Sequence, residues 1–354
     1  MNSLFADDPY RRSPDLAGEG GGEVGPRRTF ADYAPQRRMM LFAGRSNTAL
    51  SQRISDLLGF ELGQCKLKTF ANGEHYVRLG ESVRGADVFL MQSCSNPVND
   101  NLFELLLMIN AARLASAKRI TAVVPWFPYA RQDKKSAPRE PIAARLVADM
   151  LEVAGADRVL TMDLHAGQVQ GFFRVPVDHM TALPMFAQYF RDMGLPLADV
   201  VVVSPDAGRA KLAGKFAEML GVDLAVLNKV RPEHNSARIS TVIGDVAGKI
   251  CIISDDMVDT AGTLVAGAQA IRDAGATRVL SCATHGVFSP PALERIAGSV
   301  LEQVVVCDTI PIDPVTKPAN VHVLSVAGIL AETIKNVFTD DSVSAIFKGE
   351  NQLF

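Results

Sequence analysis

The sequence predicts an α/β fold of mainly parallel sheets that are covered by helices on both faces. From Met39 onward, short apolar runs alternate with amphipathic stretches of helical length, which is typical of parallel strands connected by crossover helices. The chain has 354 residues, of which 48% are hydrophobic. It is therefore long enough for two domains of ordinary size, each with its own core.

The strands are expected at short apolar runs in both halves of the chain. In order, these runs are MMLFAG, ADVFLMQ, ITAVVPW, RVLTMD, VVVVS, DLAVLN, KICIIS, RVLSCAT and QVVVC. The main helices are expected between them, at residues 52–59, 100–115, 141–154, 181–193, 207–220 and 263–274. The segments ITAVVPWFPYARQD and KICIISDDMVDTAGT occupy comparable places in the two halves, which suggests a repeated fold rather than a repeated sequence.

Two of the helices carry end signals and apolar stripes. Pro141 suits the first turn of one helix, and Gly155 follows that helix as a stop. Asn99 or Asp100 could cap the helix before it. The apolar residues expected to face the core are Ile142, Leu146, Met150 and Val153 in one helix and Leu102, Leu105, Leu106 and Ile109 in the other.

The composition argues against several classes of function. The formal net charge of -3 is not that of a general nucleic-acid-binding or membrane-surface protein. No apolar run approaches the ~18 residues of a membrane span, and the amino terminus lacks the pattern of a secretory signal. The cysteines are scattered without a C-x-x-C pair, so we expect reduced core residues of a cytoplasmic protein. They are Cys65, Cys94, Cys251, Cys282 and Cys307.

Polar residues gather directly after the predicted strands. This holds in RVLTMDLH, VVVVSPDAGR, KICIISDDMVDT, RVLSCATHG and ITAVVPWFPYARQD. Because ligands bind at the carboxyl ends of the strands in an open parallel sheet, these segments predict one or two clefts lined by Asp, His, Arg and Gly.

The stretch ISDDMVDTAGTL is the most informative of these segments. Asp255 and Asp256 follow a predicted strand, and two adjacent carboxylates suit the paired hydroxyls of a ribose. The small and hydroxyl-bearing residues 259–263 then lead into a helix, where backbone N–H groups and the positive helix end favour a phosphate. A capping acid in a turn would explain Asp259 but not the two acids before it. The stretch therefore predicts a sugar phosphate site.

These residues also resemble a known family. DDMVDTAGT is similar to the ribose-phosphate-binding loop of the phosphoribosyltransferase superfamily. The chain from about residue 39 to 345 resembles class I ribose-phosphate diphosphokinases, the phosphoribosyl pyrophosphate synthetases. The matching segments are FANGE, PVNDNLFELLLMINAARLASAKRITAVVPWFPYARQDKK, DLHAGQVQGFF, VVSPDAG, KVRP, DDMVDTAGT and ATHGVF.

The resemblance implies a domain organisation. Two phosphoribosyltransferase-like domains are expected, each a mainly parallel sheet covered by helices, at residues 39–180 and 181–345, and the second carries the ribose-phosphate loop. Residues 1–38 contain GEGGGEVG and no periodic apolar pattern, so we expect a disordered extension there. Residues 346–354 are expected to form a carboxyl-terminal tail.

The reaction that the resemblance implies moves the diphosphate of ATP to the C1 hydroxyl of ribose 5-phosphate and leaves AMP. Lys229 and Arg231 are the implied catalytic cations, although a Lys-x-Arg pair alone is usually solvated surface. The implied ATP-binding residues are Phe70, Asn72, Gly73, Glu74, Arg131 and Gln132. The implied ribose 5-phosphate-binding residues are Arg231, Asp255, Asp256, Asp259, Thr260, Ala261, Gly262 and Thr263.

Magnesium is the implied cofactor, with His165 and Asp206 as its ligands. A histidine is an unusual ligand for so hard a cation, and from its chemistry alone His165 could equally be a base or a core residue. Asp163 is a plausible partner of this pair. Where relatives carry an acid, this chain has Arg174, which leaves Asp178 as the remaining acid nearby.

The nucleotide segments raise two further expectations. Asn72 stands where the family commonly has Asp, and because the amide keeps an acceptor we expect ATP binding to survive. The polar loop from Asp133 to Arg139 is expected to act as a lid over ATP. Without the family context, RQD could equally be a surface charge cluster.

The resemblance also implies a homo-oligomer, typically a hexamer, with inorganic phosphate as an activator and neither nucleic acid nor membrane as a partner. Two other functions compete with the synthetase. One is a non-catalytic regulatory paralogue, and the other is a nucleobase phosphoribosyltransferase. The presence of every implied catalytic residue favours catalysis over the first, and the FANGE and RQD segments argue against the second.

Overall fold

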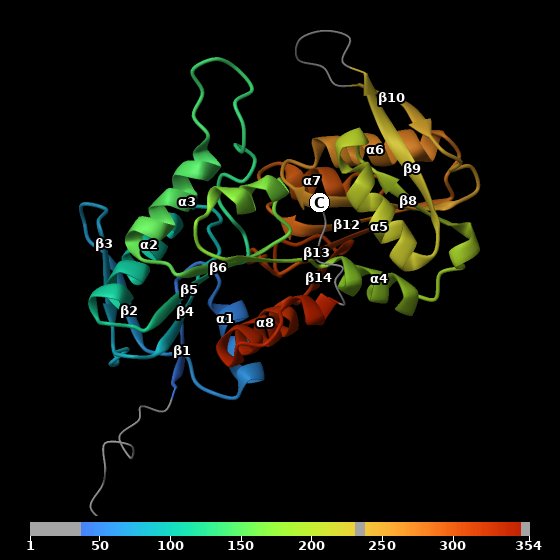
Figure 1. The fold of residues 1–354 in the computed structure, drawn as a ribbon. Coiled ribbons are helices and arrows are strands. Elements are labelled where there is room, and N and C mark those ends of the chain that lie inside the picture. The colour runs from blue at the N-terminus through green and yellow to red at the C-terminus, as the bar shows by residue number, and fades with distance from the viewer. Residues whose placement is uncertain (1–36, 231–237, 348–354) are drawn as a thin grey trace, which may run out of the picture. The chain divides into compact units, whose positions relative to one another are not determined.

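The computed structural model describes residues 37–230 and 238–347 of the chain (Figure 1). Most of the predicted extension at 1–38 and of the predicted tail at 346–354 lies outside the described residues. Two largely parallel sheets with helices on both faces confirm the predicted α/β class. No helix in the two described ranges is long and apolar enough to cross a membrane.

The first sheet has parallel strands in the order β1-β4-β5-β6-β7. The strands are β1 Met39–Ala43, β4 Asp87–Met91, β5 Arg119–Val124, β6 Arg158–Met162 and β7 Val177–Met180. On one face pack α2 (Val98–Leu114) and α3 (Ala143–Ala154), and on the other α1 (Thr48–Leu58) and α8 (Ala327–Thr339). Neighbouring residues of β1 divide between these faces, since Leu41 belongs to the core under α1 and Phe42 to the core under α2.

The second sheet has the order β10-β9-β8-β11-β12-β13-β14, and all of its pairs are parallel except β9 with β10. The strands are β8 Val200–Ser204, β9 Asp223–Val230, β10 Arg238–Ile243, β11 Ile250–Val258, β12 Arg278–Gly286, β13 Gln303–Cys307 and β14 Val321–Leu324. Its faces are covered by α4 (Leu183–Asp192) and α5 (Ala210–Leu220) on one side and by α6 (Gly262–Asp273) and α7 (Ala292–Ala297) on the other.

A separate antiparallel hairpin, β2 (Cys65–Thr69) and β3 (His75–Leu79), lies outside both sheets. Its β3 strand packs against α2. The FANGE segment forms the turn of this hairpin, and Gly73 adopts a φ of 91° there. That left-handed conformation favours glycine, which explains the residue at this position.

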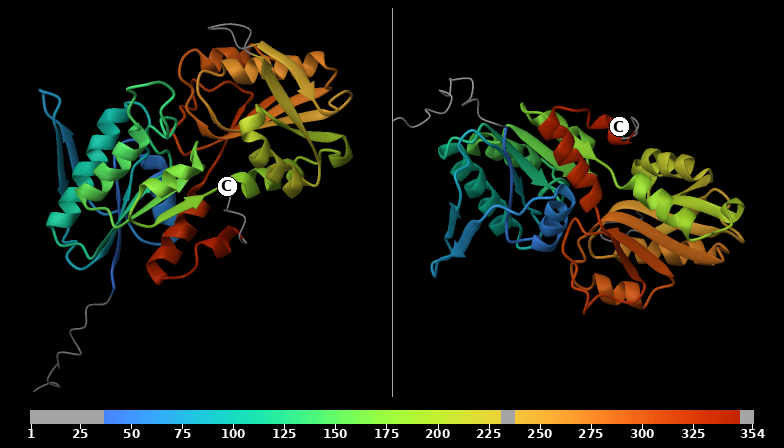
Figure 2. Two further views of the ribbon diagram at one scale, coloured as in Figure 1. Left: turned by 45° about the horizontal axis from the view of Figure 1, so that its top comes forward. Right: turned by 90° about the horizontal axis from the view of Figure 1, so that it is seen from below.

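Helix α8 connects the two halves of the chain. It follows the last strand of the second sheet but packs against α1 on the first sheet (Figure 2). Leu330 and Ile334 of α8 share one core with Leu50 of α1 and with Leu280 of the second sheet. The two sheets therefore belong to one compact unit that begins at Arg37. The domain division at residues 180 and 181 falls between β7 and α4 and stays a prediction.

The prediction for α3 was partly wrong. Leu146 is 58% exposed and Val153 is 77% exposed, so these two residues of the predicted stripe do not face the core, whereas Met150 packs against it. The buried residues of α3 are Ala144, Val147, Ala148 and Leu151. Small alanine side chains on the inner face let the helix approach the sheet closely, which an apolar periodicity alone does not reveal. Gly155 does end the helix as predicted.

The predicted starts of two helices were also wrong. Helix α2 begins at Val98 after Pro97, so neither Asn99 nor Asp100 caps it. The Asn99 side chain instead accepts a hydrogen bond from the Tyr129 hydroxyl. Pro141 precedes α3 rather than lying in its first turn. The buried stripe predicted for α2 is confirmed, because Leu102, Leu105, Leu106 and Ile109 are all buried.

The cysteines are unpaired, as predicted. Four of them are buried, and Cys65 is half-buried on β2. Burial raises the pKa of the Cys251 and Cys282 thiols to about 12, so these side chains behave as small apolar groups rather than as nucleophiles.

A buried junction joins the carboxyl ends of β6 and β12. His285 is 1% exposed, and its Nε2 lies 3.2 Å from the carbonyl oxygens of Met162 and Asp163. The Thr284 hydroxyl donates to Asp163 Oδ2 over 2.6 Å. Beside them, His179 of β7 is 4% exposed, and its Nε2 accepts a hydrogen bond of 2.8 Å from the backbone N–H of Leu164. The contacts of His285 and Thr284 join the carboxyl end of β12 in the second sheet to that of β6 in the first.

This junction predicts a pH-dependent stability. Burial lowers the pKa of His179 to about 4, whereas an unfolded histidine titrates near 6.5. The unfolded state therefore takes up a proton first, and stability present above pH 6.5 is lost as the pH falls toward 4. Because of His179, the free energy of unfolding should fall by roughly 2 kcal/mol between pH 7 and pH 5.

The variant His179→Gln tests this prediction, because its amide oxygen can still accept from Leu164 but does not titrate. Urea unfolding at pH 7 and pH 5 should show a smaller loss of unfolding free energy in the variant than in the wild type. Equal losses in both proteins would rule out His179 as the titrating group.

Candidate active site

Asp255 and Asp256 lie within a strand, not after it. β11 extends to Val258 alongside β12, whereas its pairing with β8 stops at Ile253. Asp255 and Asp256 therefore project beyond the end of β8 while they keep a strand backbone. Both carboxylates lie within 4 Å of Arg209, but their exposure differs, with 28% of the Asp255 side chain and 3% of the Asp256 side chain exposed.

Asp256 is held by residues from two other strand ends. Its Oδ2 lies 2.7 Å from His165 Nδ1 and 2.5 Å from Arg209 Nη2. The same Nη2 lies 2.7 Å from His165 Nδ1, so the three atoms form a closed triangle. Arg209 follows β8, and His165 follows β6. A single cluster thus brings together the ends of β6, β8 and β11.

Asp255 and Asp256 also differ in the pKa of their carboxyl groups. Burial alone would raise the pKa of Asp256, but the hydrogen bond from His165 and the charge of Arg209 outweigh it and lower the pKa to about 2. Burial and the adjacent Asp256 carboxylate raise the pKa of Asp255 well above its usual range. Asp256 is therefore the more acidic member of the pair.

The predicted phosphate loop connects β11 to α6. Ala261 precedes the helix with a φ of 58°, and residues 259–263 line a cavity of about 210 Å³ together with Asp255 and Arg209. Arg295 donates a hydrogen bond of 2.9 Å to the carbonyl oxygen of Thr260. This contact holds the loop from the side of α7 and leaves the first N–H groups of α6 at the cavity.

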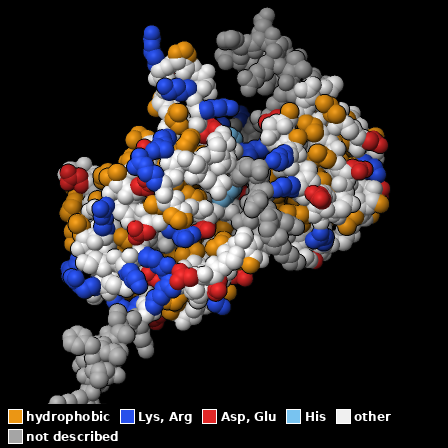
Figure 3. All heavy atoms as spheres, in the orientation of Figure 1, with side chains coloured by type: hydrophobic (Ala, Val, Ile, Leu, Met, Phe, Trp, Pro, Cys, Tyr) orange, Lys and Arg blue, Asp and Glu red, His pale blue; other side chains and the backbone are white. Residues whose placement is uncertain are grey.

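A second cavity of about 430 Å³ adjoins the first. It is lined by Asp133, Lys134, Asp163, His179 and Lys211 among others. Both cavities share Arg131, His165, Asp206, Arg209 and Asp256. These shared residues mark the place where ligands in the two cavities would meet. In the space-filling view, Lys and Arg side chains surround the hollow in the middle of this face, where histidine is also visible (Figure 3).

Arg131 and Gln132 also line a third cavity of about 540 Å³, together with Trp126 and Tyr129. Arg131 Nη1 lies 2.7 Å from Asp259 Oδ2, so the segment after β5 is joined to the phosphate loop by an ion pair. The predicted nucleotide residues Arg131 and Gln132 thus lie beside the predicted sugar phosphate site.

The other residues predicted to bind ATP lie away from the cavity that Arg131 and Gln132 line. Residues 70–74 are exposed in the turn of the β2–β3 hairpin, where Phe70 is 50% exposed. None of them lines the cavity that contains Arg131 and Gln132. Asn72 Oδ1 accepts from the Glu74 backbone N–H, which stabilises the turn.

The predicted catalytic cations are only partly described. Lys229 lies near the end of β9, paired with Ile239 of β10. Arg231 lies outside the described residues. The predicted lid from Asp133 to Arg139 is exposed beyond Asp133, whose carboxylate is buried and accepts a hydrogen bond from the Gln168 side chain.

The predicted magnesium ligands line one cavity. His165, Asp206 and Asp163 all contribute to it, and Asp163 Oδ1 is buried with no hydrogen-bond partner among the described residues. The described ranges contain no cluster of three His, Cys, Asp or Glu arranged as a metal cage. This donor set suits magnesium, which usually binds one or two carboxylates and otherwise keeps waters and substrate phosphates.

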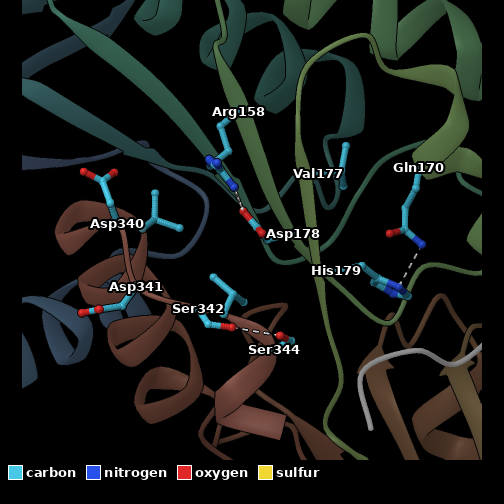
Figure 4. A pocket seen from close by; sticks show the side chains of 11 residues that line it. Arg158, Gln170, Val177, Asp178, His179, Asp340, Asp341, Ser342 and Ser344 are labelled. Atoms are coloured by element: carbon cyan, nitrogen blue, oxygen red, sulfur yellow. Dashed lines mark hydrogen bonds and ion pairs between the residues drawn. The ribbon is translucent and has the colours of Figure 1, made fainter. Parts of the chain in front are cut away.

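Asp178 and Arg174 lie elsewhere. Asp178 forms an ion pair of 2.5 Å with Arg158, and the two line a separate cavity of about 650 Å³ with residues 340–344 (Figure 4). Arg174 is exposed and lies 3.9 Å from Glu152 of α3. Asp178 therefore does not replace the missing acid beside His165 and Asp206.

The sequence reasoning missed two functional candidates, Arg209 and Arg295. Arg209 lies in VVVVSPDAGR, and its position after a strand end was the signal that could have identified it. No sequence signal links Arg295 of α7 to the loop 35 residues before it.

Comparison with known proteins places the chain in a family. A family model described as the N-terminal domain of ribose phosphate pyrophosphokinase matches residues 39–155, and one described as a phosphoribosyl synthetase-associated domain matches residues 229–348.

Two relatives and one solved structure give the extent of the similarity. Ribose-phosphate pyrophosphokinase of Synechococcus elongatus is 51% identical over 90% of this chain and 98% of its own length. The protein of that name from Fusobacterium nucleatum is 48% identical over 87% and 97%. The crystal structure of phosphoribosylpyrophosphate synthetase from Mycobacterium smegmatis matches with a TM-score of 0.82 and 47% identity, over 86% of this chain and 100% of that one. The chain belongs to the ribose-phosphate pyrophosphokinase family.

Proposed function

We propose that the chain transfers the diphosphate group of ATP to the C1 hydroxyl of ribose 5-phosphate and forms phosphoribosyl pyrophosphate and AMP. The observation that carries this proposal is the meeting of two cavities. One is lined by Asp255 and the phosphate loop, the other by Asp163, Lys134 and Lys211, and both by the predicted magnesium ligands His165 and Asp206. A transfer between two polyanions requires such an arrangement, because both must be held with the reacting atoms close together.

Ribose 5-phosphate would occupy the smaller cavity. The loop from Asp259 to Thr263 offers backbone N–H groups and hydroxyls at the amino end of α6, which suits the 5-phosphate. The Asp255 and Asp256 carboxylates lie at the same cavity and suit the ribose hydroxyls. Arg131 would exchange its ion pair with Asp259 for contacts with substrate.

ATP would occupy the cavities at Arg131 and Gln132. Arg131 can pair with phosphate, and the Gln132 amide suits the edge of a base. Half-buried Trp126 and Tyr129 line the same space and can pack against a purine. Residues 70–74 would contribute to nucleotide binding from the exposed turn of the hairpin.

Magnesium would be held by His165 and Asp206, with Asp163 beside them. When bound, it would neutralise the charge that develops on the transferred phosphoryl groups. Lys229 and Arg231 would supply further positive charge to the bridging and β oxygens, because attack at the β-phosphorus concentrates negative charge there.

We also propose a homohexamer in the cytoplasm, activated by inorganic phosphate. The exposed side chains of Phe103 and Leu146 line one apolar pocket, which supports an assembly of chains. The unpaired cysteines suit a reducing compartment. Phosphate activation rests on the family resemblance.

A product assay tests the proposed reaction directly. The purified chain with magnesium, phosphate, ATP and ribose 5-phosphate should form AMP and phosphoribosyl pyrophosphate in equal amounts, and no AMP should form when the sugar is left out. A folded protein that forms neither product would favour the regulatory paralogue. Product formation from a nucleobase and phosphoribosyl pyrophosphate would favour the transferase.

Replacement of Lys229 tests the proposed cation. Lys229→Ala should lower kcat by at least about 100-fold, because removal of one preorganised group that stabilises transition-state charge typically costs this much. The exposed Lys118 lies just before the amino end of β5, so Lys118→Ala is a matched control that should retain wild-type turnover. Near-normal turnover of Lys229→Ala would contradict its proposed role.

Replacement of Asp255 tests the sugar site. Asp255→Asn should raise the KM for ribose 5-phosphate roughly tenfold, because the amide weakens charge-assisted hydrogen bonds to the hydroxyls. The KM for ATP should change little. Asp273→Asn, at an exposed position of α6, is the control. An unchanged KM for the sugar would argue against the carboxylate clamp.

A further inference from the structure

We propose that Arg209 and Asp256 form a positioning pair that holds the His165 ring. This inference rests on the proposed function and assigns different roles to two residues that the motif alone presents as equivalent.

The first argument is the accessibility of the two acids. Only 3% of the Asp256 side chain is exposed, and its Oδ2 already contacts both His165 and Arg209. The Asp255 side chain is 28% exposed, and its closest cation atom, Arg209 Nε, lies 3.8 Å away. Asp255 Oδ1 accepts a hydrogen bond of 2.9 Å from the Asp256 backbone N–H. This bond fixes one oxygen of the Asp255 carboxylate.

The second argument is the direction of the His165 ring. Both partners, Asp256 Oδ2 and Arg209 Nη2, approach the same ring nitrogen, Nδ1, at 2.7 Å. No partner of Nε2 occurs in the described part of the chain. Because the ring is held through Nδ1, Nε2 is the nitrogen presented to a ligand. A carboxylate that holds a histidine by its other nitrogen is a common arrangement behind metal-binding histidines.

The third argument concerns Arg209 itself. A guanidinium stays charged and donates only, so Arg209 pairs with the Asp256 carboxylate, which in turn accepts the Nδ1 proton of the ring. The Arg209 side chain is 15% exposed. Its backbone N–H donates a hydrogen bond of 3.1 Å to Oδ1 of Asp206, a predicted magnesium ligand. One residue therefore connects Asp206, His165 and both acids.

Binding measurements separate this role from a general structural one. Trp126 is the single tryptophan of the chain and lines the nucleotide cavity, so its fluorescence can report the affinity for ADP, first in EDTA and then with magnesium. In Arg209→Ala, the affinity in EDTA should stay within about twofold of the wild type. The tightening that magnesium produces should shrink roughly tenfold, because the ring is no longer held.

Kinetics provide the second readout. Arg209→Ala and Asp256→Asn should lower kcat roughly 10- to 100-fold with a nearly unchanged KM for ribose 5-phosphate, opposite to the pattern expected for Asp255→Asn. Arg209→Lys should recover part of the loss, because an ammonium can pair with Asp256 but lacks the planar fork of the guanidinium. Asp256→Asn keeps the shape of the site and serves where Arg209→Ala does not fold.

Two results would overturn the proposal. A raised sugar KM with normal kcat in Asp256→Asn would make Asp256 a ribose-binding residue. Equal losses of ADP affinity with and without magnesium in Arg209→Ala would make Arg209 a phosphate-binding cation. If the wild type forms no AMP, the proposed reaction fails, whereas the magnesium-linked ADP affinity still decides the role of the pair.

Discussion

The site depends on the buried junction between the carboxyl ends of two parallel sheets. Asp163 at the end of β6 accepts hydrogen bonds from Thr284 of β12 and from the backbone of Ala182, and His285 closes the junction from the second sheet. Because these polar groups are almost fully buried, each must find a partner or destabilise the fold. This requirement leaves little freedom in the relative position of the two strand ends, and it brings His165 within hydrogen-bond distance of Asp256.

Helix α8 stabilises the same arrangement from the opposite side. Its apolar residues complete a core that contains side chains from both sheets. The floor of the site is therefore built on packed elements, whereas the segments that would cover ligands are exposed, as residues 134–139 are. A rigid floor with exposed covering loops is a common arrangement in enzymes that must hold polyanions and exclude water during transfer.

Two arginines of the site form ion pairs with acids of the same site. Arg131 pairs with Asp259, and Arg209 pairs with Asp256. These pairs differ in their burial, since the Arg131 side chain is 57% exposed and the Arg209 side chain only 15%. An exposed pair is weak and can be exchanged for a phosphate at small cost, whereas breaking a buried pair leaves an uncompensated charge. The two arginines are thus suited to different tasks, one to binding and one to positioning.

The sequence by itself determined the α/β class, most strands of both sheets and the segments that form the site, because apolar runs and the polar residues after them are local signals. It did not reveal the β2–β3 hairpin, α8 on the first sheet or the inner face of α3, which depend on packing between distant segments. The motif presented Asp255 and Asp256 as equal neighbours. Only the tertiary structure distinguished them, because β11 continues through both residues and buries Asp256 against His165 and Arg209, whereas Asp255 stays partly exposed at the cavity that both acids line.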